Sequence, residues 1–350
     1  MRVGLALPHY DFSVPGADPL AFPTVLAHAR RAEALGFDSL WVSDHLSLAI
    51  PGDGARPGTS GGTPGPPEGF AFEPLTTLAA LSRQVRRARL GTLVLCEALR
   101  PAGVLAKALA TLDHLCAGRL DIGIGAGWHA PDYAAVGMEL PPPGERLARL
   151  AEAIAVLDGL LPGGPFTFDG RFHRVREAVN RPPAVQVPRP PIFVGGKGDR
   201  LLRLVAERAD GWNTGWVWTP EAYRGRTAAL ERSCEAVGRD PATVARSLSL
   251  YALAGENRRD LERRFERMRR LAPGGTLDAV TLDQWRVGRL VGTVEEVAEQ
   301  VAGWQAHGVG ELVLGAGPLP FSVTAPDDLE VLAEALAGRV GRGPPAPGSL

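Results

Sequence analysis

The sequence contains little cysteine, no long apolar run and almost no net charge. Its three cysteines lie far apart, without the spacing of a metal-binding motif, which is typical of reduced thiols in a cytoplasmic protein. No apolar run approaches the roughly 18 residues of a membrane span. Because 38 Lys and Arg residues balance 39 Asp and Glu residues, the net charge of -1 indicates neither a nucleic-acid partner nor a membrane partner.

Metal-binding patterns are also absent. Neither HxH nor HExxH spacing occurs among the seven histidines. His9, His45 and His129 could converge with Asp44, but histidines scattered around a ligand site more often hydrogen-bond the ligand than coordinate an ion. We therefore expect no metal site.

Residues 119–129 form the most informative stretch of the chain. Apolar residues at positions 120, 122 and 124 alternate with small or polar ones, and glycines occupy positions 123, 125 and 127. The alternation predicts a buried strand, and glycine at its carboxyl end leaves main chain bare for a flat ligand or a phosphate. Trp128 and His129 follow where this strand ends. We expect it to be the fourth strand of a barrel, with its end facing a flavin-like ring.

Eight strand patterns alternate with helical ones along the chain. This alternation predicts a (β/α)8 TIM barrel, formed as a single domain by residues 1–340, with a flexible tail at 341–350. No nucleotide-type GxGxxG separates the first strand from the first helix, which argues against an open doubly wound sheet. Insertions are expected at about 47–72, which is rich in Gly and Pro, at 166–176, where Asp169-Gly170 signals a hairpin, and at 257–290.

Functional residues of such barrels follow the carboxyl ends of the strands, which we call the mouth of the barrel. Polar and aromatic residues do follow the predicted strands here. They are His9 and Tyr10, Asp44 and His45, Cys96 and Glu97, Trp128 and His129, Gly195 to Gly198, and Trp216 and Trp218. This set suits an aromatic cofactor.

The turn Gly195-Gly196-Lys197-Gly198 lies between a predicted strand and a predicted helix. Bare N–H groups at the start of a helix favour an anion, and Lys197 adds positive charge. The alternative is an ordinary tight turn. We expect this turn to bind a phosphate.

Several stretches together resemble one family, the bacterial-luciferase-like monooxygenase superfamily, in its branch dependent on the deazaflavin coenzyme F-420. The resemblance covers most of the chain, to about residue 315. Its motifs lie at 33–45 (EALGFDSLWVSDH), 89–95 (RLGTLVL), 106–113 (AKALATLD), 118–129 (GRLDIGIGAGWH), 194–196 (VGG), 209–212 (ADGW) and 291–297 (VGTVEEV). The family has a (β/α)8 barrel, in agreement with the alternation of strands and helices.

The resemblance also implies roles for particular residues. Asp44 and His45 would contact the deazaflavin ring, and a cis peptide bond between Leu93 and Val94 would support the ring from behind. The turn of Gly125, Ala126 and Gly127 would lie along the cofactor, and Gly195-Gly196 would match the phosphate turn. Trp128 stands where some dehydrogenases of the family carry a Glu, which argues against a sugar-phosphate substrate.

The sequence therefore predicts an oxidoreductase that transfers a hydride between F-420 and a small organic substrate. The candidate catalytic residues are His45, Asp44, Glu97 and Trp128. Two alternatives stay open: a two-component monooxygenase that uses reduced FMN and O₂, and a non-catalytic protein that binds flavin or deazaflavin. A homodimer is expected from the resemblance, with apolar positions on two helices available for the interface, at Leu78, Leu81, Leu105 and Leu109. These leucines could equally be ordinary residues that face the barrel.

Overall fold

A computed structural model describes residues 1–17, 19–49 and 68–337. Most of the predicted insertion at 47–72 and all of the predicted tail at 341–350 lie outside the described residues. Within the described part of the chain, no helix combines the length and the apolar character needed to cross a membrane.

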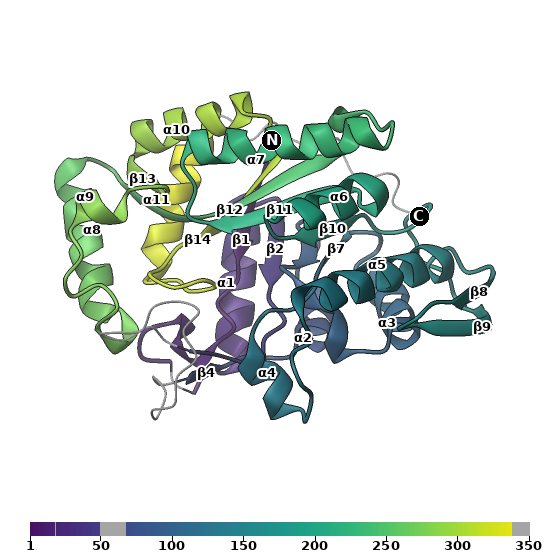
Figure 1. The fold of residues 1–350 in the computed structure, drawn as a ribbon. Coiled ribbons are helices and arrows are strands. Elements are labelled where there is room, and N and C mark those ends of the chain that lie inside the picture. The colour runs from purple at the N-terminus through teal and green to yellow at the C-terminus, as the bar shows by residue number, and fades with distance from the viewer. Residues whose placement is uncertain (18, 50–67, 338–350) are drawn as a thin grey trace.

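Eight parallel strands close into a barrel, as the alternation of strands and helices predicts. The last strand pairs with the first, with Arg2 opposite Glu311, so the sheet has no open edge. Figure 1 shows the strands at the centre of the molecule. In chain order they are β1 (Arg2–Ala6), β2 (Ser39–Val42), β5 (Arg89–Thr92), β7 (Leu120–Gly125), β10 (Ile192–Gly195), β11 (Gly211–Trp216), β12 (Ala245–Gly255) and β14 (Glu311–Gly315).

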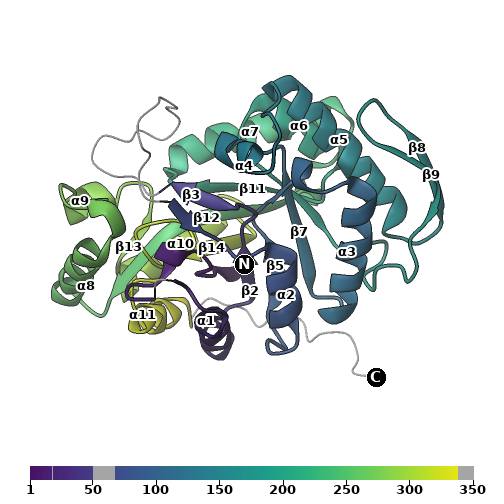
Figure 2. The same ribbon diagram turned by 90° about the horizontal axis from the view of Figure 1, so that it is seen from below.

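Helices surround the barrel, and Figure 2 shows them as an outer ring around the strands. Their apolar faces pack on the strands, because leucine and alanine recur at helical spacing along each of them. The helices of the ring are α1 (Phe22–Ala34), α2 (Pro74–Ser82), α3 (Ala102–Leu115), α5 (Pro143–Leu160), α6 (Asp199–Arg208), α7 (Pro220–Ala236), α10 (Val294–Ala306) and α11 (Pro326–Ala337).

The four leucines proposed for a dimer interface belong to this packing. Leu78 and Leu81 of α2 and Leu105 and Leu109 of α3 are at most 1% exposed, in the main hydrophobic core. They face the barrel and are not available to a second chain. The expectation that they form a dimer interface is therefore wrong.

Two antiparallel hairpins lie outside the barrel strands. The hairpin predicted at Asp169-Gly170 consists of β8 (Pro165–Asp169) and β9 (Arg174–Val179), and the Glu152 carboxylate accepts from three N–H groups in its turn, at residues 171–173. In the second antiparallel pair, β3 (Ser47–Ala49) lies beside β4 (Glu68–Phe70), after the end of β2.

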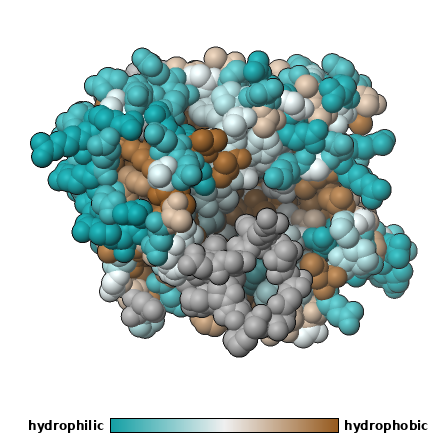
Figure 3. Space-filling view, turned by 60° about the vertical axis from the view of Figure 1, so that its left-hand side comes forward, coloured by the Kyte–Doolittle hydropathy of each residue, from teal (hydrophilic) through white to brown (hydrophobic). Residues whose placement is uncertain are grey.

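The chain between β12 and α10 corresponds to the insertion expected at 257–290. It contains helix α8 (Arg258–Leu271) and the short helix α9 (Leu282–Trp285). A further strand, β13 (Leu290–Thr293), pairs with the second half of β12 and was not predicted. Figure 3, viewed from the side of α8 and α9, shows a hydrophilic surface there and a hollow with a hydrophobic floor near the middle of the view.

The third predicted strand is divided in two. It ends as β5 at Thr92, and the chain resumes pairing with β7 as β6 (Leu95–Cys96). The peptide bond between Leu93 and Val94, which lies in the gap, is cis, as the family resemblance predicts.

Charged side chains gather at the amino ends of the strands, inside the barrel. Arg2 lies 3.0 Å from Glu311 and 3.2 Å from Asp121, and Arg89 lies 2.6 Å from Asp121. Ser39 donates a hydrogen bond of 2.6 Å to Glu311. We call these five residues the amino-end cluster. They come from five of the barrel strands and therefore fix the mutual register of those strands.

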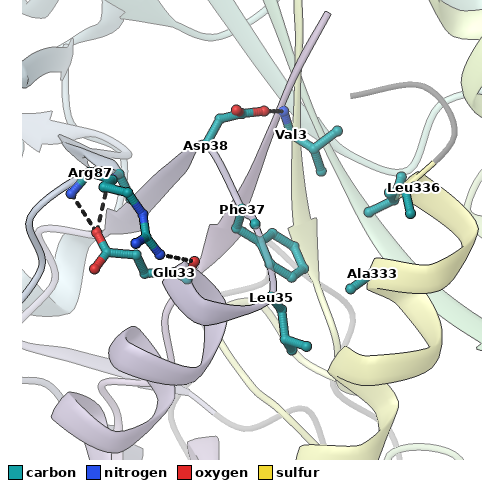
Figure 4. Close-up of a pocket in the computed structure, with 11 residues that line it drawn as sticks. Val3, Glu33, Leu35, Phe37, Asp38, Arg87, Ala333 and Leu336 are labelled. Atoms are coloured by element: carbon teal, nitrogen blue, oxygen red, sulfur yellow. Dashed lines mark hydrogen bonds between the residues drawn. The ribbon is translucent and has the colours of Figure 1, made fainter. Parts of the chain in front are cut away.

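A hollow of about 740 Å³ opens beside this end of the barrel, and Figure 4 shows the residues around it. Its polar groups have partners: Asp38 accepts from the Val3 N–H, and Glu33 accepts from N–H groups at 86–88. The amino ends of barrel strands serve stability and the carboxyl ends serve function. We therefore assign no functional site to this hollow.

Burial raises the pKa of Glu311 to about 7, although Arg2 acts in the opposite direction. In the folded state this carboxyl group holds its proton more tightly than in the unfolded state, so the unfolding free energy should fall as pH rises from about 4.5 to about 7, by up to roughly 3 kcal/mol. Urea unfolding of the wild-type chain and of Glu311→Gln, compared at several pH values, measures this contribution. Parallel stability profiles for the two proteins would contradict it.

Candidate active site

Asp44, directly after β2, is a buried anchor for the chain around it. Its carboxylate accepts from the Cys96 N–H at 2.9 Å and from both terminal nitrogens of Arg100, at 2.6 and 3.0 Å. The side chain of Asp44 is only 3% exposed. This bidentate pair fixes the loop after β2 to β6, and Arg100 was not identified from the sequence.

His45 points away from Asp44 and toward the short helix α4 (Ala130–Ala135), which was also not predicted. Its Nδ1 lies 2.6 Å from Oδ2 of Asp132. The other carboxylate oxygen of Asp132 accepts from the N–H groups of Leu46 and Ser47. One carboxylate therefore fixes both the imidazole and the chain that follows it.

The pKa of Asp132 lies well below its usual range. Burial acts to raise it, but the imidazoles of His129 and His45 and the Ser47 N–H outweigh the burial and favour the ionised form. An ionised carboxylate accepts from its neighbour, so His45 carries a proton on Nδ1 and directs Nε2 away from Asp132. Asp132 was missed because α4 is too short to show a helical pattern, and its one signal was its position three residues after His129.

Trp128 forms an exposed wall next to this pair. Its side chain is 61% exposed, and its ring lies 5.5 Å from the His45 ring in an edge-on arrangement and 5.1 Å from the His129 ring. An indole neither gains nor loses a proton near neutral pH. Trp128 can therefore offer a ligand an aromatic surface but cannot move protons.

Glu97, the other candidate acid, is buried and already paired. Its carboxylate lies 2.7 Å from Nε2 of His173, at the turn of the β8–β9 hairpin, and Glu97 is 3% exposed. His173 was not identified from the sequence, because 76 residues separate it from Glu97. The pair connects the hairpin to the loop after β6.

His9 lies apart from this group. Its Nδ1 donates to the Leu7 carbonyl at 2.9 Å, and its Nε2 accepts from the Ser43 N–H at 3.2 Å. Burial lowers the pKa of His9 to about 4, so the ring is neutral near pH 7. The metal set considered from the sequence therefore does not assemble, because His9 and Asp44 are engaged elsewhere.

The glycines of β7 and β10 make room for one side chain. A Cβ atom at Gly125 or Gly195 would come within about 3.0 Å of the Val94 side chain, and one at Gly123 would lie 2.0 Å from the Thr92 carbonyl oxygen as well as 3.0 Å from Val94. Val94 therefore fills the space beside these glycines, where we expected a ligand from the sequence. Leu93, next to it, donates its N–H to the Val42 carbonyl at 2.7 Å.

The turn after β7 is held by side chains from α4 and α5. Gly127 has a φ of +72°, and a Cβ there would lie 2.2 Å from the Tyr133 hydroxyl. That hydroxyl donates to the Ala126 carbonyl at 3.4 Å, and Arg146 donates to the Gly127 carbonyl. Only glycine fits position 127, for reasons of backbone conformation and of space.

The predicted phosphate turn is only partly free to bind an anion. The Gly196 N–H donates to the Asn213 carbonyl at 3.0 Å, and the Gly196 carbonyl accepts from Trp212 Nε1. Helix α6 begins after Gly198 without a side-chain cap, and a Cβ at Gly198 would meet nothing within 4 Å. The groups suited to an anion are therefore at Lys197, Gly198 and the first turn of α6, and not at Gly196.

Trp216 and Trp218 have different roles. Trp216 follows a second cis peptide bond, at Gly215–Trp216, and lies 5.4 Å from Phe321 and from Tyr251 in an apolar cluster inside the mouth. Trp218 is 7% exposed and packs in the main core, 6.1 Å from Tyr223. Only Trp216 belongs to the lining of the barrel.

Comparisons with known proteins agree with this fold. The family described as Luciferase-like monooxygenase matches residues 1–311. An F420-dependent glucose-6-phosphate dehydrogenase from Beutenbergia cavernae is 36% identical over 198 residues, 56% of this chain and 53% of that protein, so the match spans about half of its length.

Two solved structures share the fold along nearly the whole chain. An F420-dependent secondary alcohol dehydrogenase in complex with an F420-acetone adduct has a TM-score of 0.74 and 18% identity, covering 96% of this chain and 98% of that one. A riboflavin lyase with modified FMN and the substrate riboflavin also has a TM-score of 0.74, with 15% identity, covering 97% and 92%. At such identities the likeness concerns the fold alone.

Proposed function

The chain belongs to the luciferase-like monooxygenase family, and we propose that it is an oxidoreductase that transfers a hydride between coenzyme F-420 and a small organic substrate. The observation that carries the proposal is the pair of His45 and Asp132, which holds a partly exposed imidazole at the mouth of the barrel. F420-dependent proteins among the similar sequences and structures support the choice of cofactor.

The residues present fit such a cofactor. When bound, F-420 supplies the hydride donor or acceptor. The chain at Leu93 and Val94 would support its ring, and the uncapped start of α6 with Lys197 would bind its phosphate. The turn of Gly125, Ala126 and Gly127 is already packed by Val94, Tyr133 and Arg146 and is not part of the proposed site. The open space beside Gly198 leaves room for that group.

His45 is the proposed proton carrier. Because its Nδ1 is held by Asp132, Nε2 is the nitrogen left to give or take a proton at the substrate, and imidazole is suited to this near neutral pH. Asp44 would act by fixing the loop that carries His45, through Arg100. Glu97, paired with His173, would position the chain after β6.

The lining of the mouth favours an uncharged substrate with apolar surface. Trp128 offers an exposed indole, and Trp216 lies in an apolar cluster with Phe321. Since Trp128 occupies a position where some F-420-dependent dehydrogenases carry a Glu, we propose a substrate other than a sugar phosphate.

The first prediction separates F-420 from FMN. Binding titrations of the pure protein with each cofactor, run side by side, should show F-420 bound at least about tenfold more tightly, a difference of about 1.4 kcal/mol. Tighter binding of FMN than of F-420 would instead favour a two-component monooxygenase. The riboflavin lyase, a structure of the same fold, holds a modified FMN. Tight F-420 binding without turnover on any alcohol or carbonyl substrate would favour a non-catalytic binding protein.

The second prediction concerns His45. His45→Ala should keep F-420 binding within about tenfold while lowering turnover by roughly 10²-fold or more, because a proton carrier is lost and the cofactor turn is untouched. His114→Ala, on α3, is the matched control and should behave as wild type. If His45→Ala keeps near-full turnover, His45 is only a positioning residue. If the variant loses F-420 binding completely, His45 belongs to the wall that binds the cofactor.

The third prediction concerns the start of α6. Gly198 has a φ of -77°, which any residue adopts, and open space where a side chain would begin. Gly198→Val should therefore leave thermal stability unchanged but weaken F-420 binding by about 1–3 kcal/mol, since it fills the space proposed for the phosphate. Gly225→Val, at another open glycine, controls for the substitution itself. If Gly198→Val and Gly225→Val bind F-420 equally tightly, the phosphate does not bind at this turn.

The fourth prediction concerns assembly. We propose a cytoplasmic homodimer, the arrangement that the family resemblance implies, with an interface other than the four buried leucines. Light scattering at micromolar concentration should give twice the 37.0 kDa mass of the chain. A mass of one chain would refute the dimer.

A further inference from the structure

Three potential metal ligands converge at the mouth of the barrel. They are one ring nitrogen each of His45 and His129 and a carboxylate oxygen of Asp132, all within 4.8 Å of one another. Oδ2 of Asp132 lies 2.6 Å from His45 and 3.1 Å from His129. Ligand atoms around a tetrahedral zinc ion lie roughly 3.3 Å apart, so small side-chain shifts would bring these three to coordination distance.

His129 is buried beside the same carboxylate without a well-aligned hydrogen bond. Its side chain is only 9% exposed, its Nδ1 lies 3.1 Å from Oδ2 of Asp132, and among the described residues none makes a well-aligned hydrogen bond to that nitrogen. A buried polar atom without a partner is costly, and folded proteins seldom keep one without a reason. A cation bound between the two imidazoles and Asp132 would satisfy this nitrogen.

The chemistry of the ligands selects the kind of ion. Two imidazoles and one carboxylate suit zinc and similar divalent transition metals, whereas Mg²⁺ and Ca²⁺ prefer oxygen ligands alone. The second oxygen of Asp132 is held by the N–H groups of Leu46 and Ser47, which fixes the carboxylate as outer-shell partners do in metal sites. His45 is 18% exposed, so the three residues lie close to the surface of the mouth.

We propose that His45, His129 and Asp132 form a binding site for a divalent transition metal, best satisfied by Zn²⁺. The ion would take the place of the proton on Nδ1 of His45. If the proposed function holds, zinc would therefore inhibit turnover by binding the residue that carries the substrate proton. The binding itself does not depend on that function.

Calorimetric titration of the metal-free full-length protein with ZnCl₂, without cofactor, tests the site. About one Zn²⁺ should bind per chain. His129→Ala and Asp132→Asn should each weaken binding roughly a hundredfold or more, because loss of an outer-shell partner alone costs 10–100-fold. Asp132→Asn keeps an oxygen for the Leu46 and Ser47 N–H groups, and circular dichroism verifies that both variants are folded. His114→Ala should bind as wild type.

The proposed site is wrong if the wild-type chain does not bind zinc stoichiometrically. It is also wrong if both variants bind zinc as the wild type does, since the metal would then lie elsewhere on the surface. Absorption spectra with CoCl₂ provide a second readout. A visible band of low-coordinate cobalt should arise with wild type and be lost in His129→Ala. Inhibition of F-420-dependent turnover by zinc is measured separately, so failure of the proposed function leaves the binding result interpretable.

Discussion

The closed barrel depends on a small group of charges buried at the amino ends of its strands. Closure turns alternate side chains of every strand inward, and the carboxylates of Asp121 and Glu311 need partners because they are buried there. Arg2 meets this requirement for both Glu311 and Asp121, and it joins strands whose residues lie 309 positions apart in the sequence. Loss of Arg2 would remove an ion pair from both buried carboxylates, although Asp121 would keep Arg89, so Arg2 is the member of the amino-end cluster that joins β1 to both β7 and β14.

Because the amino-end cluster fixes one end of the barrel, the other end can carry loops that are packed less tightly. There the strands are followed by polar groups that hold loops instead of filling a core. Asp44 fixes β6 and Arg100, and Asp132 fixes the chain at Leu46 and Ser47. A binding site requires such supports, because residues on loops keep their geometry only when neighbouring groups restrain them.

Much of this fold could be predicted from the sequence because its signals are local. The eight strand patterns correspond to the eight barrel strands, and Thr293 caps α10 through a reciprocal hydrogen-bonding pattern with Glu296, three residues further on. The hairpin follows from Asp169-Gly170. The cis bond at Leu93–Val94, in contrast, came from family resemblance alone, since no local pattern distinguishes it.

The elements that were missed depend on contacts between distant segments. Strand β13 is four residues long and is recognisable only by its pairing with β12. The glycines of β7 were interpreted as space for a ligand, yet their neighbour is Val94, which the backbone after β5 brings against them. Asp132 and His173 gain their partners only when α4 and the hairpin turn fold against the mouth.

Asp44 and His45 show how adjacent residues acquire different chemistry. Side chains that follow one another on an extended chain point in opposite directions, so only one of the pair can face a given neighbour. The Asp44 carboxylate pairs with the Arg100 guanidinium, and this ion pair is largely buried. His45 meets a carboxylate that is already ionised, which holds Nδ1 and leaves Nε2 outside this contact. The surroundings of each side chain at this mouth are therefore set by the partner that it meets, although the two residues are neighbours in the sequence.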